Sequence, residues 1–200
     1  MAKRKTKTPK VPASLPPVQQ GLISPKRNVP GTIARPPYAL SGYPGPSILP
    51  LTRTSSEIKS MGKAGAIAAE VLLHVGEKVT AGISTDKLDE IAHDEIIRQG
   101  AYPSPLNYRG FRKSICTSVN EVVCHGIPSD RVLRDVDAIN VDITAIVDEY
   151  YGDTSIQPKD KGLPGFVPNV GINLGLPLFP VEGDEQFANA YPFPIFSAAC

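Results

Sequence analysis

The ten residues AINVDITAIV, numbers 138–147, alternate apolar and polar side chains. A period of two predicts a β-strand with one apolar and one polar face, and Asp142 and Thr144 share the polar face. The acidic dipeptide that follows supplies a turn into a second run, residues 150–155. If the chain returns as a hairpin, Asp153 comes back near Asp142. The stretch therefore predicts two carboxylates on neighbouring strands.

Two neighbouring carboxylates have two interpretations. If they are buried side by side they repel each other, and a cation must lie between them. If they are solvated on an exposed sheet face they need no partner, and spacing alone favours this second interpretation. His125, between Cys124 and Gly126, also has two interpretations, a catalytic residue or an ordinary surface or core residue. A lone histidine is more often a surface or core residue than a catalyst.

Two amphipathic helices are predicted before this strand. Residues 54–57, Thr-Ser-Ser-Glu, have the capping-box pattern, and an apolar stripe with three- and four-residue spacing follows. The stripe comprises Ile58, Met61, Ala64, Ile67, Ala68, Val71, Leu72 and Val75. Ser84 or Thr85 caps a second helix that ends at Gly100. Its predicted buried face comprises Leu88, Ile91, Ala92, Ile96 and Ile97.

Short β-branched runs follow the helices, at residues 115–119 and 122–124, and they predict two further strands. Helices followed by strands indicate an α+β fold rather than a parallel α/β sheet. Residues 54–155 are therefore expected to form one folded unit.

The two ends of the sequence differ from this unit in composition. Residues 1–50 hold eleven of the 21 prolines and eight Lys or Arg with no acid, so residues 1–53 are expected to form a basic, Pro-rich, disordered arm. Its cluster of cations at residues 3–10 is open to two interpretations, a solvated linker or an electrostatic contact with RNA. Residues 156–200 hold seven prolines and five glycines and are expected to be an irregular tail.

Composition also excludes several classes of protein. The sequence has no run of 18 apolar residues and no basic segment followed by an apolar one, so a membrane span and a secretory signal are not predicted and the cytoplasm is the expected compartment. Three cysteines without a CxxC pair argue against a zinc ribbon. Any metal is therefore expected to be held by histidines and carboxylates.

Three motifs give the chain a family resemblance. The run SICTSVNEVVCHGIP, residues 114–128, is followed by NVDIT at 140–144 and GDT at 152–154. Together they closely resemble the type 1 methionine aminopeptidases, over residues 54–155. The resemblance implies the first half of a pita-bread fold. The implied activity is metal-dependent hydrolysis that removes the N-terminal methionine from nascent proteins.

The resemblance also implies a catalytic site. Asp142 and Asp153 match the family's ligands to two divalent metal ions, for which Co, Mn, Fe and Zn are all candidates. The ions activate a water and polarise the peptide carbonyl of the substrate. His125 matches the catalytic histidine that also contacts the substrate.

Two further sites follow from the same resemblance. Tyr108, Phe111 and Cys116 match positions that line the pocket for the substrate's methionine side chain, where an apolar, sulfur-tolerant wall suits a thioether. Asn120 and Val122 match backbone-carbonyl ligands of a monovalent-cation site. The implied substrates are nascent peptides that begin with methionine.

The resemblance stops near residue 155. The second half of the family's domain supplies a ligand His, a catalytic His and two ligand Glu, whereas this sequence has no histidine after His125. The chain is therefore expected to be truncated, with an incomplete metal site and impaired catalysis. The alternative is a non-catalytic half-domain that binds the ribosome or another partner through its basic arm, with no membrane and no specific DNA involved. A proline dipeptidase of the same fold is a weaker alternative, because the run at 116–128 argues against it.

Overall fold

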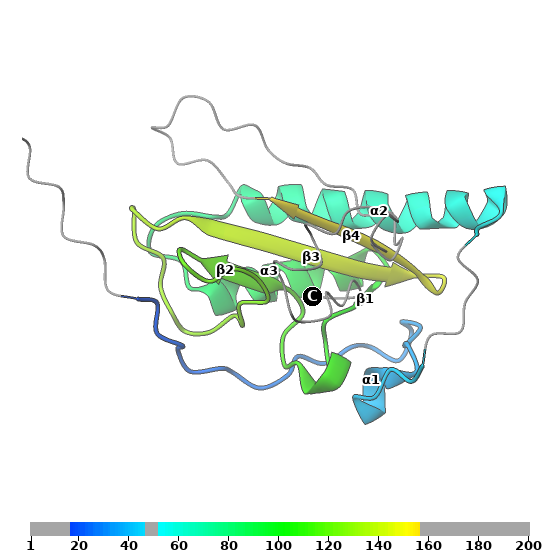
Figure 1. Ribbon diagram of the computed structural model, residues 1–200, viewed down its shortest axis with the longest axis horizontal. Coiled ribbons are helices and arrows are strands. Elements are labelled where there is room, and N and C mark those ends of the chain that lie inside the picture. The colour runs from blue at the N-terminus through cyan, green and yellow to red at the C-terminus, as the bar shows by residue number, and fades with distance from the viewer. Residues whose placement is uncertain (1–16, 47–51, 157–200) are drawn as a thin grey trace, which may run out of the picture.

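The computed structural model describes residues 17–46 and 52–156, which form a four-stranded antiparallel sheet with two long helices on one face (Figure 1). The helices are α1 (Tyr38–Ser41), α2 (Ser55–Gly76) and α3 (Thr85–Arg98), and a 3-10 turn, η1, covers Tyr108–Gly110. The strands are β1 (Tyr102–Pro103), β2 (Cys116–Val119), β3 (Ile139–Val147) and β4 (Tyr150–Ile156). The predicted α+β class is confirmed.

Strand β3 is the centre of the sheet. It pairs with β4 through the predicted hairpin, and it also pairs with β2 at residues 139–142 and with β1 at residues 145–146. Several β3 residues pair with β4 on one edge of the strand and with β1 or β2 on the other edge. Strands β1 and β2 therefore lie end to end along the edge of β3 opposite β4. The predicted alternation is confirmed, since the odd-numbered residues of β3 belong to the hydrophobic core.

Helix α2 begins at the predicted capping box. The hydroxyl of Thr54 accepts a hydrogen bond from the Glu57 N–H at 3.3 Å, and the Glu57 carboxylate accepts one from the Thr54 N–H at 2.7 Å. The predicted apolar stripe is buried against the sheet with one exception. Ile58 is 56% exposed, because the first turn of α2 extends beyond the end of the sheet (Figure 1).

Glycine at position 152 lets α2 lie close against β4. A Cβ atom added to Gly152 would lie 2.1 Å from the carbonyl carbon and oxygen of Ala64 in α2. Any side chain there would push the helix away from the strand. Since neighbouring residues of a strand face opposite ways, this contact on the helix side leaves Asp153 on the open side of the sheet.

Helix α3 starts at Ser84, whose hydroxyl accepts a hydrogen bond from the Lys87 N–H at 3.1 Å. Leu88, Ala92 and Ile96 are fully buried, as predicted. The other two predicted members of the face, at positions 91 and 97, are only partly buried, because the helix turns a polar edge inward as well.

That inward polar edge consists of Asp89 and His93, which are 0% and 4% exposed. One Asp89 oxygen accepts hydrogen bonds from the N–H groups of Ser114 and Ile115 at 2.6 and 3.2 Å. The His93 ring lies 2.7 Å from the Ser114 hydroxyl. Burial raises the pKa of Asp89, although these N–H groups and Arg27 oppose the rise. The two side chains hold the segment that leads into β2.

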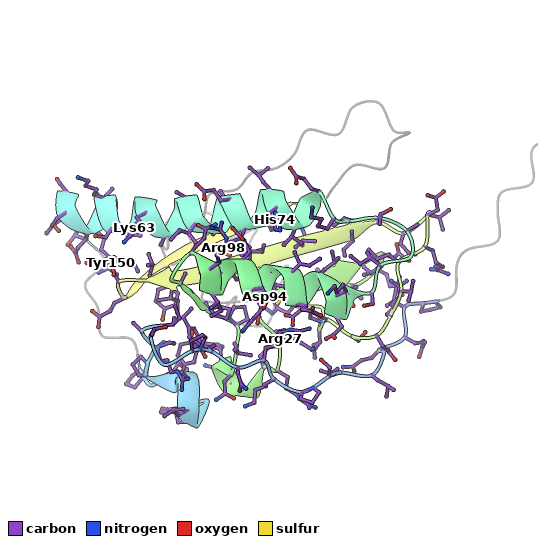
Figure 2. All side chains as sticks on the ribbon, turned by 180° about the vertical axis from the view of Figure 1, so that it is seen from behind. Arg27, Lys63, His74, Asp94, Arg98 and Tyr150 are labelled. Atoms are coloured by element: carbon purple, nitrogen blue, oxygen red, sulfur yellow. The ribbon has the colours of Figure 1, made fainter. Side chains whose placement is uncertain are left out.

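The expectation of a disordered arm is wrong for residues 17–46, which dock on the folded unit. They lie along the folded unit and reach α3, where Figure 2 shows Arg27 beside the helix. Its guanidinium donates to Asp89 at 3.0 Å, and the buried Lys113 ammonium donates to Ser24 of the arm at 2.6 Å. The arm itself contains cations and no acid, and the acids that Arg27 meets follow about 60 residues later, so the composition of the arm alone suggested a solvated segment.

Two other expectations differ from the structure or fall outside it. Residues 122–124 are not a strand, because the chain turns after β2 and the Val122 N–H donates to the Val119 carbonyl at 3.1 Å. The predicted irregular tail, apart from its first residue, and the Lys3–Lys10 cluster lie outside the described residues. None of the helices within 17–46 and 52–156 is long and apolar enough to cross a membrane.

Candidate metal centre

The open face of the sheet carries the two predicted carboxylates. Thr144 pairs with Asp153 across β3 and β4, and Asp142 lies two residues before Thr144, diagonally across from Asp153 on the same face. The Thr144 hydroxyl donates a hydrogen bond to Asp153 at 2.9 Å, which fixes that carboxylate. The structure therefore brings Asp142 and Asp153 together, as the hairpin pattern predicted.

Asp142 and Asp153 share a poorly solvated position. Burial, and next to it the charge of Asp153, raises the pKa of Asp142 to about 7. Near neutral pH, two adjacent carboxylates of this kind hold a proton or a cation. Both side chains are only partly buried, and the raised pKa of Asp142 favours the interpretation of a repelling, partly desolvated pair over that of two fully solvated surface acids.

Apolar and small polar side chains surround the pair on both sides. Cys116 of β2 lies directly opposite Asp142, and Ser155 of β4 lies opposite it on the other edge of β3. Cys116 is fully buried. Since directly paired residues share a face, Cys116 is next to the carboxylates, where the resemblance places it.

An aromatic cluster covers the other end of the same face. Tyr38 packs edge-to-face against Tyr108 and Tyr102, with ring centroids 5.2 and 6.5 Å apart. Ile146 and Tyr151, which face each other across β3 and β4, pack against this cluster. Ile146 and Tyr151 are the next pair on this face after Thr144 and Asp153, two residues along each strand. An apolar wall therefore adjoins the carboxylate pair.

Of the three predicted pocket residues, Cys116 is closest along the sheet to the carboxylates. Tyr108 belongs to the aromatic cluster, and Phe111, which follows η1, is partly buried. Tyr38 and Tyr102 also line this wall and were not predicted. Tyr38 comes from the arm, and its hydroxyl donates to the Ser104 carbonyl at 2.7 Å, a contact over 66 residues that no local pattern could reveal.

His125 lies in the loop after β2. Its neighbour Gly126 accepts a hydrogen bond from the Thr117 N–H at 2.8 Å, so this loop runs along the outer edge of β2. The imidazole is exposed, and the backbone of His125 has a positive φ of 55°. The structure thus places His125 in the loop beside β2, and β2 lies between this loop and the strand β3 that carries Asp142.

Asn120 and Val122 form the turn that leaves β2. The Asn120 side chain donates to Asp137 at 2.9 Å and accepts from the Ala138 N–H at 3.0 Å. Asn120 has a positive φ of 54°, a conformation that asparagine tolerates better than most residues. The side-chain contacts fix the turn and leave its backbone carbonyls as candidate ligands.

The donor set fits part of a divalent metal site. Two adjacent carboxylates give the oxygen ligands that hard and borderline divalent cations accept, and their mutual repulsion is relieved by a cation. In residues 17–46 and 52–156, no group of three or more His, Cys, Asp or Glu gathers as a candidate metal site. The pair would therefore need ligands from other residues to complete a metal site.

A family comparison covers the sheet and most of α2. Residues 59–156 match Metallopeptidase family M24, and the match extends from α2 to β4 with both carboxylates inside it. Over this part, just under half of the sequence, the chain resembles that family. The M24 match ends at the last described strand.

The curated proteins that this chain resembles include methionine aminopeptidases. The chain is 48% identical over 139 residues to methionine aminopeptidase 1D, chloroplastic/mitochondrial, of Arabidopsis thaliana, covering 69% of this chain and 40% of the relative. It is 47% identical over 135 residues to methionine aminopeptidase 2 of Mycobacterium tuberculosis, covering 68% and 47%. The chain thus spans less than half the length of these two relatives.

Solved structures give the same fold. The methionine aminopeptidase of Rickettsia prowazekii matches with a TM-score of 0.52 and 45% identity, over 53% of this chain and 43% of that one. The enzyme of Thermotoga maritima matches with a TM-score of 0.51 and 30% identity, over 52% and 43%. The expected pita-bread fold, in its first half, is confirmed.

Proposed function

We propose that this M24-like domain takes part in the metal-dependent removal of N-terminal methionine, with Asp142 and Asp153 as metal ligands. The observation that carries the proposal is the position of the two carboxylates, diagonal neighbours on one face with a raised Asp142 pKa. A bound divalent metal pair supplies a water nucleophile and polarises the scissile carbonyl. Co, Mn, Fe and Zn all suit this donor chemistry.

The remaining residues have supporting roles in this proposal. Thr144 keeps the Asp153 carboxylate in place through its 2.9 Å hydrogen bond. Cys116, Tyr108 and Phe111 form the apolar wall that receives the methionine side chain of a nascent peptide, where a thioether makes favourable contacts with sulfur and aromatic rings.

Two loops complete the proposed site. In this proposal, the His125 side chain in the loop beside β2 donates a hydrogen bond to the charge that develops on the substrate. The carbonyls of Asn120 and Val122 hold a monovalent cation in the turn after β2, close to the strand that carries Cys116. The cytoplasm is the proposed compartment, although one of the relatives above is named chloroplastic/mitochondrial.

The proposed catalysis needs more ligands than this chain provides. By resemblance, the family adds one histidine and two glutamates to the two aspartates, and the 200-residue sequence has no histidine after His125. We infer that the 200-residue chain alone binds metal weakly and does not hydrolyse methionyl peptides at the rate of its relatives.

Metal titration tests the ligand assignment. Calorimetry with Mn²⁺ on the 200-residue chain is expected to show weak, saturable binding that Asp142→Asn and Asp153→Asn each abolish. Asp135→Asn, an exposed aspartate in the loop before β3, is the matched control and is expected to bind as the unmodified chain does. Equal Mn²⁺ affinity in all four proteins would refute the assignment.

A second candidate function rests on charge. Residues 1–50 carry eight cations and no acid, which suits a contact with the phosphate backbone of ribosomal RNA near the nascent chain. Co-sedimentation with ribosomes that weakens with salt and with replacement of the lysines at positions 3–10 would support this function. Ribosome binding that survives both changes would argue against it.

A further inference from the structure

A small cavity lies between the arm and the folded unit, and neither Asp142 nor Asp153 lines it. Its volume is about 190 Å³, and arm residues 26–29, 35 and 39 line one side. The other side is formed by Tyr102, Leu106 and Asn107. Typical sites for drug-sized ligands span about 300–1,000 Å³, so this cavity suits a much smaller molecule.

The lining of this cavity is cationic. Lys26, Arg27 and Arg35 line it, and none of its lining residues is acidic. Arg27 is already neutralised, because it pairs with Asp89 at 3.0 Å and with Asp86 at 3.4 Å. Lys26 and Arg35 form no ion pair with another described residue. Two positive charges without an ion-pair partner, both on solvent-exposed residues, therefore line one small cavity.

Each of these two cations donates to one neutral acceptor. Lys26 donates to the Asn107 side-chain oxygen at 2.6 Å, and Arg35 donates to the Val29 carbonyl at 2.6 Å, so both side chains are held in place with further N–H groups to offer. Within the described part of the chain, the backbone N–H groups of Asn28 and Val29 donate to no protein atom. Donors without acceptors are typical of an anion site.

The rest of the lining is apolar. Val29, Ala39 and Leu106 contribute aliphatic surface, and the Tyr102 ring, 2% exposed, closes one wall. The Tyr102 hydroxyl is occupied by the Leu106 carbonyl at 2.8 Å. An anion with a small apolar substituent therefore satisfies both kinds of surface better than a bare ion.

We propose that this cavity binds a small phosphate monoester, with Lys26 and Arg35 holding the phosphate group and the Tyr102 wall holding its organic part. None of the lining residues is a proposed metal ligand, although Tyr102 also belongs to the aromatic cluster, and the inference does not depend on the proposed function. It uses the arm as one wall, so it exists only while the arm is docked.

Calorimetry of the 200-residue chain tests this site, with inorganic phosphate and phenyl phosphate as probes. Millimolar binding of phosphate is expected, with phenyl phosphate binding about threefold to tenfold more tightly because its ring adds apolar burial. Replacing both cations, Lys26→Gln and Arg35→Gln, keeps hydrogen-bonding groups but removes the charge. This variant is expected to lose at least about tenfold in affinity for both probes.

The matched control removes two charges elsewhere. Lys63 and Arg98 lie on α2 and α3 (Figure 2), with side chains 59% and 69% exposed, and Lys63→Gln with Arg98→Gln is expected to bind both probes as the unmodified chain does. Thermal melts of both variants verify folding.

Three outcomes overturn the proposal. They are no saturable binding of either probe, equal loss of affinity in both double variants, and equal affinity for phosphate and phenyl phosphate. A single-stranded RNA oligonucleotide distinguishes the source of the phosphate, because tighter RNA binding that persists in the Lys26 and Arg35 variant places the phosphate contact elsewhere on the chain.

Discussion

Replacing Asp142 with asparagine is expected to stabilise the metal-free chain at neutral and higher pH. In the folded protein, burial and the neighbouring Asp153 charge raise the pKa of Asp142 from 3.8 to about 7. Asparagine has nearly the same shape but carries no charge, and its amide donates a hydrogen bond to a neighbouring carboxylate. The substitution therefore removes the repulsion between the two side chains.

The size and sign of the effect follow from the raised pKa. Between pH 4 and pH 7 the folded state binds more protons than the unfolded state, so the free energy of unfolding falls as pH rises through this window. A rise of about three pKa units corresponds to about 4 kcal/mol as an upper limit. Because the two carboxylates titrate together, about 2–4 kcal/mol is expected for the pair.

Urea unfolding followed by circular dichroism measures this effect. The unmodified chain in EDTA is expected to lose stability between pH 4.5 and pH 8, by about 2–4 kcal/mol more than Asp142→Asn loses over the same range. Asp135→Asn serves as the control and keeps the full pH dependence. Adding Mn²⁺ at pH 8 is expected to stabilise the unmodified chain but not Asp142→Asn.

One result would refute this reasoning. If Asp142→Asn and the unmodified chain have the same pH dependence in EDTA, then Asp142 is ionised at neutral pH without cost. The pair would then be a solvated pair of surface acids, and its assignment as a metal half-site would lose its physical basis.

Three further predictions concern stability, and urea unfolding checks each of them. Gly152→Ala places a methyl group 2.1 Å from the α2 backbone and is expected to lower the free energy of unfolding by about 3 kcal/mol. Gly62→Ala, with open space around its Cβ, is the control and is expected to stabilise α2 by about 0.5–1 kcal/mol. Similar effects of the two substitutions would contradict the close packing of β4 and α2. Thr54→Ala removes the capping hydroxyl and is expected to cost about 1 kcal/mol, and a neutral result would show that the cap adds nothing. Arg27→Ala removes an ion-pair partner of the fully buried Asp89 carboxylate and is expected to lower the free energy of unfolding by about 3 kcal/mol. The exposed Arg98→Ala is the control and is expected to lower it by less than about 0.5 kcal/mol. Equal costs would mean that the arm does not contribute to stability.

Features set by neighbours in sequence were predictable. The capping box at Thr54 and the apolar stripe of α2 depend on residues three and four positions apart, and both were found as predicted. The placement of Asp142 beside Asp153 follows from a period of two and a tight turn, so it was predictable from 16 residues, 138–153.

Features set by distant contacts were not predictable. Asp89 and His93 occupy positions that look solvent-exposed on a helix. They are buried because the backbone N–H groups at 114 and 115 donate to Asp89 and the Ser114 hydroxyl bonds to the His93 ring, 21 to 26 residues later in the chain. Tyr38 in the arm joins the aromatic wall through a partner 66 residues away. A Pro-rich composition indicates low regular structure, but it says nothing about whether a segment docks on another surface.

The arm's docking also has a consequence for the order of folding. Ser24 leaves the ribosome first, but its hydrogen-bond donor Lys113 follows 89 residues later. At about 5–20 residues per second, the arm waits roughly 4–18 s for this partner during synthesis. The acids of α3 that Arg27 meets follow it by 59 and 62 residues, so they are made before Lys113. This early segment therefore reaches its full set of native contacts late.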